Sequence, residues 1–327
     1  MKPKVATSLI VIALVPTLLV SSQDVRIFGK EKLLHPDQMM ISQKALVIIG
    51  APPFTEQQLL KKMTAILLKE HGYRVEEIEF YDSRTIRNAQ ENGYIDLYWE
   101  YTNSARTVYH KKPPVFDPEQ AFLAVAEEDH KKGLVWLPKS QFNNKWAIIM
   151  KEQIARLLHI KTISDLVAYT NQYPQKLKIA TNKTFLYSQK GFEFLQQAYG
   201  IEPEKADIIA LNNELLANAV QEGNVDVAVG WVTFGKLMDA NSRLVLLEDD
   251  RHVFPPDYIA PVVNEQLLQR NPELEPLIRN VTNALNEETM RELNYKVDVL
   301  NIPIAKVARQ FLLQAGLIPA QRADTSK

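Results

Sequence analysis

The feature that most constrains the fold is the regular alternation of strand-like and helix-like segments between residues 45 and 101. Residues 45–49 form an apolar run typical of a buried strand, which Gly50 and Pro52-Pro53 end. A helical pattern then begins at Thr55-Glu56, with leucines, methionine and isoleucine on one face. A second strand (74–80), a second helix (84–91) and an aromatic strand (94–103) follow. This order predicts a mostly parallel α/β sheet.

The rest of the chain repeats these segment types. We expect strands at 133–137, 143–150, 178–180, 225–229 and 244–250, and helices at 191–199 and 213–221. We expect a helix near 162–166, with Ser164 as its cap. Pro255-Pro256 and Pro261 are expected to interrupt the chain. Residues 272–317 are expected to be mainly helical. Two α/β units with two crossings predict a discontinuous first lobe (24–140 and 251–327), a second lobe (141–250) and a cleft between them.

Residues 1–22 have the features of an export signal. Lys2 and Lys4 precede an apolar run from Leu9 to Val20, and Ser21-Ser22 provide small residues near a cleavage point. The alternative is an uncleaved N-terminal anchor, although the run is short for a membrane span. The 327-residue chain contains no cysteine, which excludes disulfides and a lipid-modified cysteine. We therefore expect a periplasmic protein.

Charge and histidine spacing exclude some classes of function. The 38 basic and 39 acidic residues give a formal net charge of -1, without a basic block, so nucleic-acid binding has no support. The six histidines lack metal-ligand spacing, and no catalytic or phosphate-binding motif is present. We expect no metal, no cofactor and no enzymatic activity. The absence of a heptad seam predicts a monomer.

The segment Tyr94-Ile95-Asp96-Leu97-Tyr98-Trp99-Glu100-Tyr101-Thr102-Asn103 is dense in aromatic residues. In an extended strand, Tyr98 and Glu100 share one face, and Trp99 and Tyr101 share the other. Aromatic faces attract desolvated cations, above all quaternary ammonium groups. The alternative is a core strand, because aromatic residues mostly serve cores.

Ordered motifs resemble one known family across residues 48–317. They include Phe54-Thr55-Glu56, Asp96 to Thr102, Phe142-Asn143-Asn144, Glu222 to Ala228, Leu247 to Pro256 and Glu288 to Asn294. The chain resembles the glycine betaine/choline-type substrate-binding proteins of osmoprotectant ABC importers. That resemblance implies a two-lobe periplasmic-binding-protein fold (type II-like), with two crossing segments, an interlobe cleft and an importer permease as partner.

The resemblance also implies a set of ligand-binding positions in an aromatic box for a trimethylammonium compound. These positions are Phe54, Thr55, Tyr101, Thr102, Asn143, Asn144, Trp146, Tyr187, Trp231 and Phe234. The aromatic members have core packing as their alternative role, and Asn143-Asn144 have a turn or helix cap. Glu56 is expected to be a first-turn helix acid instead of a ligand contact.

Three departures from the family pattern bear on the ligand. The family's first turn is usually Gly-Ser-Lys, whereas this chain has Gly50-Ala51-Pro52. The family's Ser-Thr-Asp-Gly turn is replaced here by Val232-Thr233-Phe234-Gly235. Residues 182–190, where many relatives have an Arg, contain none. The site is therefore expected to be more aromatic and less cationic than usual, which leaves choline-like or larger ligands open beside glycine betaine. Two other function classes remain: a periplasmic sensor subunit, and an enzyme on the same two-lobe architecture. Porphobilinogen deaminase has that architecture but needs a cysteine, which this chain lacks.

Overall fold

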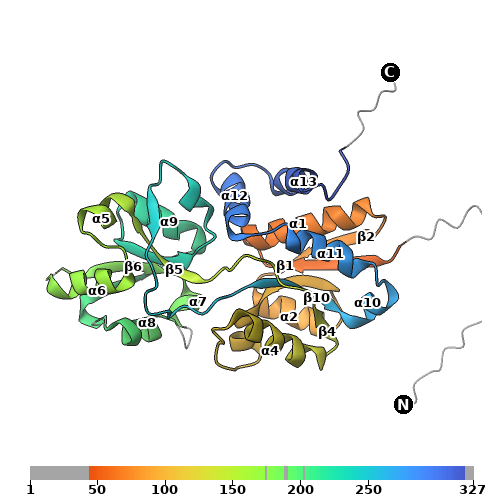
Figure 1. Cartoon of the computed structure of the whole chain (residues 1–327), viewed down its shortest axis with the longest axis horizontal. Helices are drawn as coiled ribbons and strands as arrows, with labels where there is room; N and C mark the ends of the chain where they lie inside the picture. Colours follow the sequence, from red (N-terminus) through yellow and green to blue (C-terminus); the bar gives the residue numbers. More distant parts are fainter. Residues whose placement is uncertain (1–43, 174, 188–190, 202, 321–327) are drawn as a thin grey trace, which may run out of the picture. The chain divides into compact units, whose positions relative to one another are not determined.

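The computed structural model describes residues 44–173, 175–187, 191–201 and 203–320. The expected signal sequence (1–22) and the segment after it (24–42) lie outside the described residues. Within the described part, no helix combines the length and the apolar character needed to span a bilayer. The described residues contain two five-stranded sheets, each of which forms one lobe (Figure 1).

The first lobe is built on the sheet β2-β1-β3-β10-β4. Strand β1 pairs in parallel with β2 and β3, whereas β10 is antiparallel to both β3 and β4. Its strands are β1 (Leu46–Ala51), β2 (Arg74–Glu79), β3 (Leu97–Tyr101), β4 (Leu134–Trp136) and β10 (Ile259–Asn264). Its helices are α1 (Thr55–Glu70), α2 (Ser83–Glu91), α3 (Thr102–Ser104), the π-helical η2 (Ala105–Tyr109), α4 (Pro118–His130), α10 (Glu265–Arg270), α11 (Leu274–Asn283), α12 (Glu287–Asp298) and α13 (Ile304–Gln314).

The second lobe has the sheet β7-β6-β8-β5-β9, with β6 parallel to β7 and β8, and β5 antiparallel to β8 and β9. Its strands are β5 (Trp146–Lys151), β6 (Leu177–Thr181), β7 (Ala206–Ala210), β8 (Val227–Trp231) and β9 (Leu244–Leu246). Its helices are α5 (Glu152–Leu157), α6 (Ile163–Gln172), α7 (Lys183–Leu186), α8 (Phe192–Tyr199), α9 (Asn213–Glu222) and the 3-10 helices η3 (Pro203–Lys205) and η4 (Gly235–Met238). The two sheets therefore share one pattern of strand directions.

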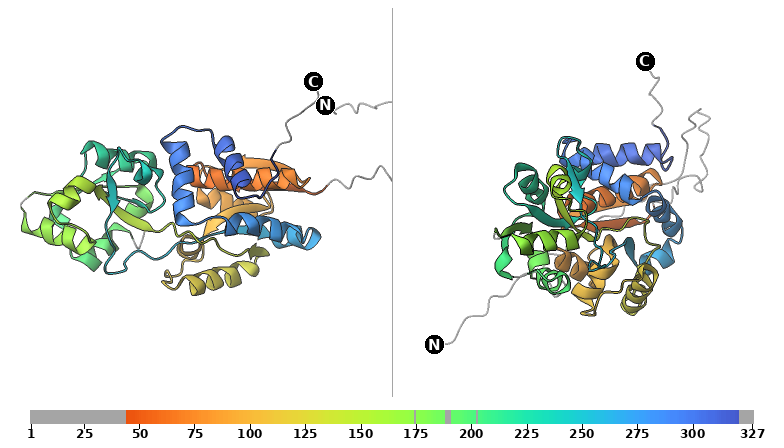
Figure 2. Two further views of the ribbon diagram at one scale, coloured as in Figure 1. Left: turned by 45° about the horizontal axis from the view of Figure 1, so that its top comes forward. Right: turned by 60° about the vertical axis from the view of Figure 1, so that its left-hand side comes forward.

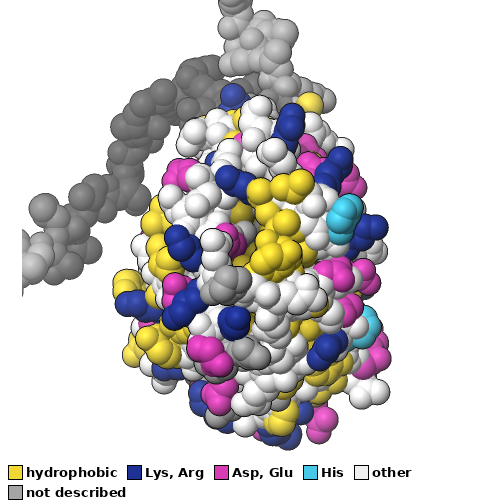
Figure 3. Space-filling view, turned by 90° about the vertical axis from the view of Figure 1, so that its left-hand side faces the viewer, with side chains coloured by type: hydrophobic (Ala, Val, Ile, Leu, Met, Phe, Trp, Pro, Cys, Tyr) yellow, Lys and Arg dark blue, Asp and Glu magenta, His cyan; other side chains and the backbone are white. Residues whose placement is uncertain are grey.

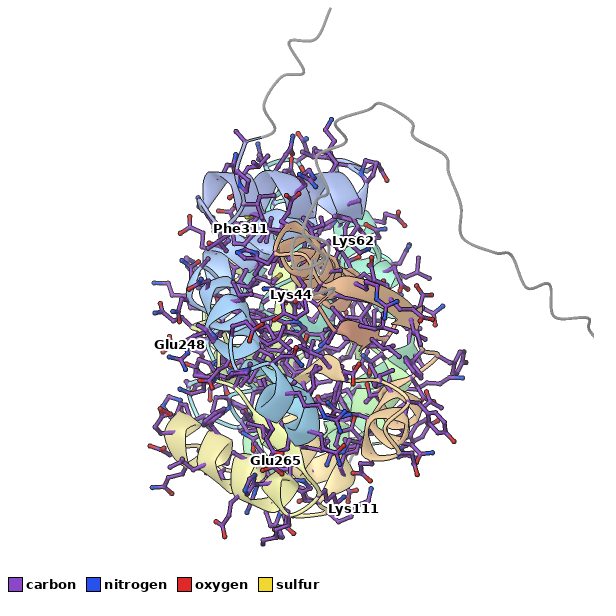
Figure 4. The ribbon with its side chains drawn as sticks, turned by 90° about the vertical axis from the view of Figure 1, so that its right-hand side faces the viewer. Lys44, Lys62, Lys111, Glu248, Glu265 and Phe311 are labelled. Atoms are coloured by element: carbon purple, nitrogen blue, oxygen red, sulfur yellow. The ribbon has the colours of Figure 1, made fainter. Side chains whose placement is uncertain are left out.

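Each sheet is covered by helices on both faces. In Figure 1, α1 and α11 lie on one side of the first sheet, and α2 and α4 lie on the other. The same arrangement gives each lobe two separate apolar clusters of buried residues. Helix α13 lies against α1, as seen in the views of Figure 2 and in Figure 4, where Phe311 and Lys62 are labelled. These layers confirm the predicted α/β class. The expectation of a mostly parallel sheet was wrong, because each sheet has two parallel and two antiparallel pairings in the described residues, the antiparallel ones made by β10 in the first lobe and by β5 in the second.

The aromatic strand β3 has the predicted alternation. Trp99 and Tyr101 belong to the cluster beneath α1, whereas Tyr98 belongs to the cluster on the opposite face. The indole Nε1 of Trp99 donates a hydrogen bond of 3.0 Å to Thr64 Oγ1 on α1. All five residues of the strand are buried, so most of this aromatic density stabilises the core of the first lobe.

Several local predictions differ from the structure. Thr162, and not Ser164, caps α6, because its hydroxyl accepts from the Asp165 amide in a capping box. Strand β8 begins at Val227 instead of 225, and β9 ends at Leu246 instead of 250. Pro261 does not interrupt the chain but lies inside β10. The Pro261 carbonyl accepts a hydrogen bond from the backbone amide of Leu137, just beyond the end of β4. The amide hydrogen that proline lacks would therefore point to a place where β4 has already ended.

Gly235 allows the two lobes to approach closely at η4 and α12. A Cβ atom on Gly235 would lie 2.3 Å from the backbone nitrogen of Tyr295 and 2.6 Å from the carbonyl carbon of Asn294. Such a contact requires the α12 backbone to move. In addition, Arg291 Nε donates a 2.9 Å hydrogen bond to the carbonyl of Val232 across the same contact.

We expect Gly235→Ala to lower the free energy of unfolding by about 1–3 kcal/mol, as overpacking does in close-packed interiors. Urea unfolding of the chain measures this change. Lys236→Ala is the matched control, because it alters the next residue of η4 without adding an atom at the contact. Equal stability of Gly235→Ala and wild type would show that α12 is free to shift.

Glu100 of β3 is a buried acid. It is 4% exposed, and its Oε1 accepts from the Tyr101 amide at 2.7 Å. Burial raises its pKa from 4.5 to about 7, with the hydrogen bond from Tyr101 opposing the rise. Because the folded-state pKa exceeds the unfolded one, the folded chain holds a proton that the unfolded chain has lost between these pH values. The contribution of Glu100 to the free energy of unfolding therefore falls as the pH rises from 4.5 to about 7, and it stays lower above that pH.

Glu100→Gln should remove this loss. The free energy of unfolding of the variant, minus that of wild type, should rise by about 3 kcal/mol between pH 4.5 and pH 8. Chemical denaturation at several pH values measures the difference, with the exposed Glu127→Gln as the control for losing one carboxyl group. A difference that does not change with pH would contradict the expectation.

Candidate functional site

The predicted site residues lie at the same edge of each sheet. Tyr101 ends β3, and Phe54 lies in the turn after β1, which are the carboxyl ends of parallel strands. In the second lobe, Trp231 ends β8, and Trp146 begins the antiparallel β5 directly opposite it. Ligand sites of open α/β sheets lie outside these strand ends. The topology therefore places both sets of residues where a cleft is expected.

A buried polar network joins residues that are far apart in sequence. It consists of Glu56, Tyr101, Asn144, Thr233 and Asn294, which are between 2% and 9% exposed. The Tyr101 hydroxyl and Asn144 Nδ2 (2.9 Å) both donate to Glu56 Oε1, and Asn294 Nδ2 donates to Oε2 at 3.2 Å. Thr233 Oγ1 donates to Asn144 Oδ1 at 2.7 Å, and Asn294 Nδ2 also donates to the Thr233 carbonyl at 2.9 Å.

The carboxyl group of Glu56 is the centre of this network. Burial raises its pKa, and the hydrogen bonds from Tyr101, Thr233, Asn294 and Asn144 oppose the rise. Among the described residues, no Lys, Arg or His side chain forms an ion pair with it. Glu56 itself lies on α1, and its partners come from β3, the first crossing (137–145, between β4 and β5), the turn after β8 and α12; the second crossing is 247–258, between β9 and β10. Glu56 is thus more than a first-turn helix acid, because it holds together the segments that carry the predicted site.

Aromatic rings gather at the edge of the second sheet. The rings of Trp146 and Trp231, here called the tryptophan pair, are stacked with centroids 4.5 Å apart. Phe234 meets Trp231 edge-on at 5.5 Å, and Phe185 lies 4.9 Å from Trp146. Both tryptophans are half-buried. Paired ring faces with partial exposure suit contact with an alkylated cation.

A cleft of about 590 Å³ opens beside the two crossing segments, and we call it the crossing cleft. Its volume is within the range of small-molecule sites. Asn143 and Lys145 line it from the first crossing, and His252, Phe254, Pro256 and Tyr258 line it from the second, with Phe116 and Pro118 completing the wall. Phe254 lies 6.1 Å from Phe185, which in turn contacts Trp146. A chain of rings thus leads from the cleft to the tryptophan pair.

The two crossings are fixed to each other and to the lobes. Asn143 Oδ1 accepts from the Asp257 amide at 2.7 Å, and the Asn144 amide donates to the Asp257 carbonyl at 2.9 Å. The carboxylate of Asp249 accepts from the amides of Val253 (2.9 Å) and Phe254 (2.8 Å). These bonds set the place of Phe254 in the cleft wall.

The other predicted residues lie in several environments. Thr102 is buried and exchanges hydrogen bonds with the backbone of Tyr258. The Thr55 hydroxyl donates to Asp298 Oδ1 at 2.5 Å, and Phe54 packs against the apolar cluster under α1. Tyr187 is 79% exposed. Of the ten predicted positions, Asn143 lines the crossing cleft, Tyr101 and Asn144 lie in the buried polar network, and Trp146, Trp231 and Phe234 form one ring cluster.

Sequence reasoning missed Lys145, His252, Phe116 and Tyr258 as residues of the cleft. Their positions depend on how the two crossings run beside each other, and no local pattern shows that. One sequence feature could have indicated that Lys145 belongs to the site: it lies between Asn144 and Trp146, which were both predicted site residues. A search of the described residues finds no group of three or more His, Cys, Asp or Glu side chains that could hold a metal ion.

Comparisons with known proteins show which family the chain is similar to. Residues 45–314 match the family described as the substrate binding domain of ABC-type glycine betaine transport systems. The chain is 32% identical, over 85% of its length, to 90% of the glycine-betaine-binding protein of Pseudomonas aeruginosa. It is 27% identical to the carnitine transport binding protein OpuCC of Listeria monocytogenes, covering 83% of this chain and 87% of that one.

A solved structure is similar in fold as well as in sequence. The crystal structure described as a glycine betaine/carnitine/choline ABC transporter has a TM-score of 0.73 and 27% identity, covering 83% of this chain and 99% of that one. The family match spans most of the chain and includes both lobes and both crossings. The chain therefore belongs to the family of substrate-binding domains of ABC-type glycine betaine transport systems.

Proposed function

We propose that this chain captures a small quaternary-ammonium or related zwitterionic solute in its interlobe site and delivers it to the permease of an ABC importer. The observation that carries this proposal is the aromatic character of the site: the crossing cleft is lined by Phe116, Phe254 and Tyr258 and is connected through Phe185 to the tryptophan pair. Methylated ammonium groups offer no strong hydrogen-bond donor, so ring faces are their best partners.

The finer assignments belong to the same proposal. The protein acts outside the cytoplasm, in a periplasm, after export through residues 1–22, as a monomer without enzymatic activity. Its lobes comprise 24–140 with 251–327, and 141–250. On the face in Figure 3, basic and acidic side chains are interspersed, which supports a small-molecule ligand over a nucleic acid. The sensor and enzyme alternatives have less support, because the matched family is a transport family.

The ligand-binding positions are proposed with distinct roles. Trp146, Trp231 and Phe234 supply ring faces, and Asn143 supplies an amide in the cleft wall. Tyr101 and Asn144 orient the wall through their hydrogen bonds to Glu56. Phe54, Thr55, Thr102 and Tyr187 remain proposed contacts of a closed, ligand-bound form.

Isothermal titration of the mature chain with glycine betaine, carnitine and choline tests the proposal. At least one of these compounds should bind, and Trp231→Ala should weaken that binding roughly thirtyfold, because a desolvated cation–π contact contributes about 2 kcal/mol. Trp231→Phe should keep most of the affinity, since a ring remains.

Tyr94→Ala is the control, because Tyr94 is 72% exposed and precedes β3, at the end of the strand opposite Tyr101. Thermal melting checks that each variant is folded. Failure of all three compounds to bind, or equal affinity of wild type and Trp231→Ala, would show that the proposal is wrong.

A further inference from the structure

The polar groups of the crossing cleft are unbalanced in charge. The residues that line it include one lysine, Lys145, one histidine, His252, and one asparagine, Asn143; its other lining residues are phenylalanine, proline and tyrosine. No carboxyl group is among these lining residues. An aromatic cleft with a fixed positive charge suits a ligand that has an anionic group as well as an alkylated one.

Lys145 has no anionic partner among the described residues. Its Nζ atom forms no ion pair and no hydrogen bond there, although the residue is half-buried. Nearby Lys139 differs, since its Nζ lies 2.9 Å from Glu119 Oε2 and also lies over the rings of Phe122 and Tyr258. A partly desolvated ammonium without a counter-ion gains free energy when an anion arrives.

The backbone holds Lys145 in place at the cleft. Its carbonyl accepts from the Val232 amide at 3.2 Å, which extends the β5–β8 pairing by one step past Trp146 and Trp231. On its other side, Asn144 is held by Glu56 and Thr233. A side chain mounted on a fixed backbone can position an anion at little cost in entropy.

The charged groups on the two sides of residue 144 have opposite signs. Asn144, the preceding residue, contacts the buried carboxyl group of Glu56, whereas Lys145 faces the cleft. Trp146, one member of the tryptophan pair, follows Lys145 directly in the chain. Phe116, Phe254 and Tyr258 line the same cleft as Lys145, so a ligand with an alkylated ammonium at one end and an anion at the other has groups there that suit each end.

We propose that Lys145 is the carboxylate anchor of this site, so that the ligand is a zwitterion bearing an alkylated ammonium and a carboxylate, and not an uncarboxylated cation such as choline. This inference rests on the proposed function. Lys145 takes the place of the Lys that is missing from the first turn, Gly50-Ala51-Pro52, and of the Arg that is missing from residues 182–190.

The test compares glycine betaine with choline, which has a hydroxyl in place of the carboxylate, by isothermal titration at low salt. Lys145→Met keeps the length of the side chain and removes its charge. It should weaken glycine betaine at least tenfold, a change of about 1.4 kcal/mol, and leave choline within about twofold of wild type. Lys145→Arg should keep most of the affinity for glycine betaine, because the charge remains.

Lys151→Met is the matched control. Lys151 is also half-buried and ends the same strand, roughly 20 Å away at the usual rise per residue. Thermal melting of each variant separates loss of fold from loss of binding. A parallel titration with carnitine tests whether a longer zwitterion uses the same anchor, in which case Lys145→Met also weakens it.

The outcomes separate the two levels of the proposal. If no quaternary ammonium compound binds wild type, both the proposed function and this inference are wrong. If choline binds wild type and glycine betaine does not, or if Lys145→Met weakens both equally, or if it leaves glycine betaine unchanged, the inference alone is overturned.

Discussion

The buried carboxyl group of Glu56 is the constraint on which the site depends. A buried acid without an ion-pair partner is costly, and this one is stabilised by neutral donors from Tyr101, Asn144 and Asn294. These donors come from segments separated by as many as 238 residues in the chain. Satisfying one carboxyl group therefore fixes the start of α1, the end of β3, the first crossing and α12 relative to one another. Thr233 extends the network to the second lobe.

The site residues gain their positions from this arrangement. Asn144 stands two residues before Trp146, and Thr233 stands two residues after Trp231. The hydrogen bond between Asn144 and Thr233 thus holds the tryptophan pair at the edge of the second sheet. The close approach at Gly235 keeps α12, and with it Asn294, against the same turn. The aromatic rings and the ammonium of Lys145 then project from a backbone that is held on both sides of the cleft.

Much of the fold follows from local patterns in the sequence. The helix at Thr55 and the strands at 46–51 and 97–101 were predictable, because their apolar periodicities are strong and Gly50 and the prolines mark a boundary. Strand β10 was not, because Pro261 argues against a central strand until the end of β4 is known. Strand β7 and helix α4 were not predicted, although Asp117 and Pro118 are a recognisable start signal for α4, and the cap of α6 was displaced by two residues.

The site was predictable only in part, for a related reason. Sequence position indicated that Trp146 and Trp231 lie at strand ends, and the structure places them in register. The role of Glu56 was hidden, because an acid in the first turn of a helix is common and its three donors are distant in sequence. Lys145 was likewise passed over, since a lysine before a strand gains meaning only when the cleft beside it is known. Long-range pairing, and not residue type, carried the missing information.

The most direct test is a crystal structure of the chain with glycine betaine bound. We predict that the ligand lies between the lobes at the two crossings, with its trimethylammonium group against aromatic ring faces and its carboxylate within hydrogen-bond distance of Lys145 Nζ. A ligand bound elsewhere, or one whose ammonium group faces solvent while Lys145 has no contact with it, would contradict the account.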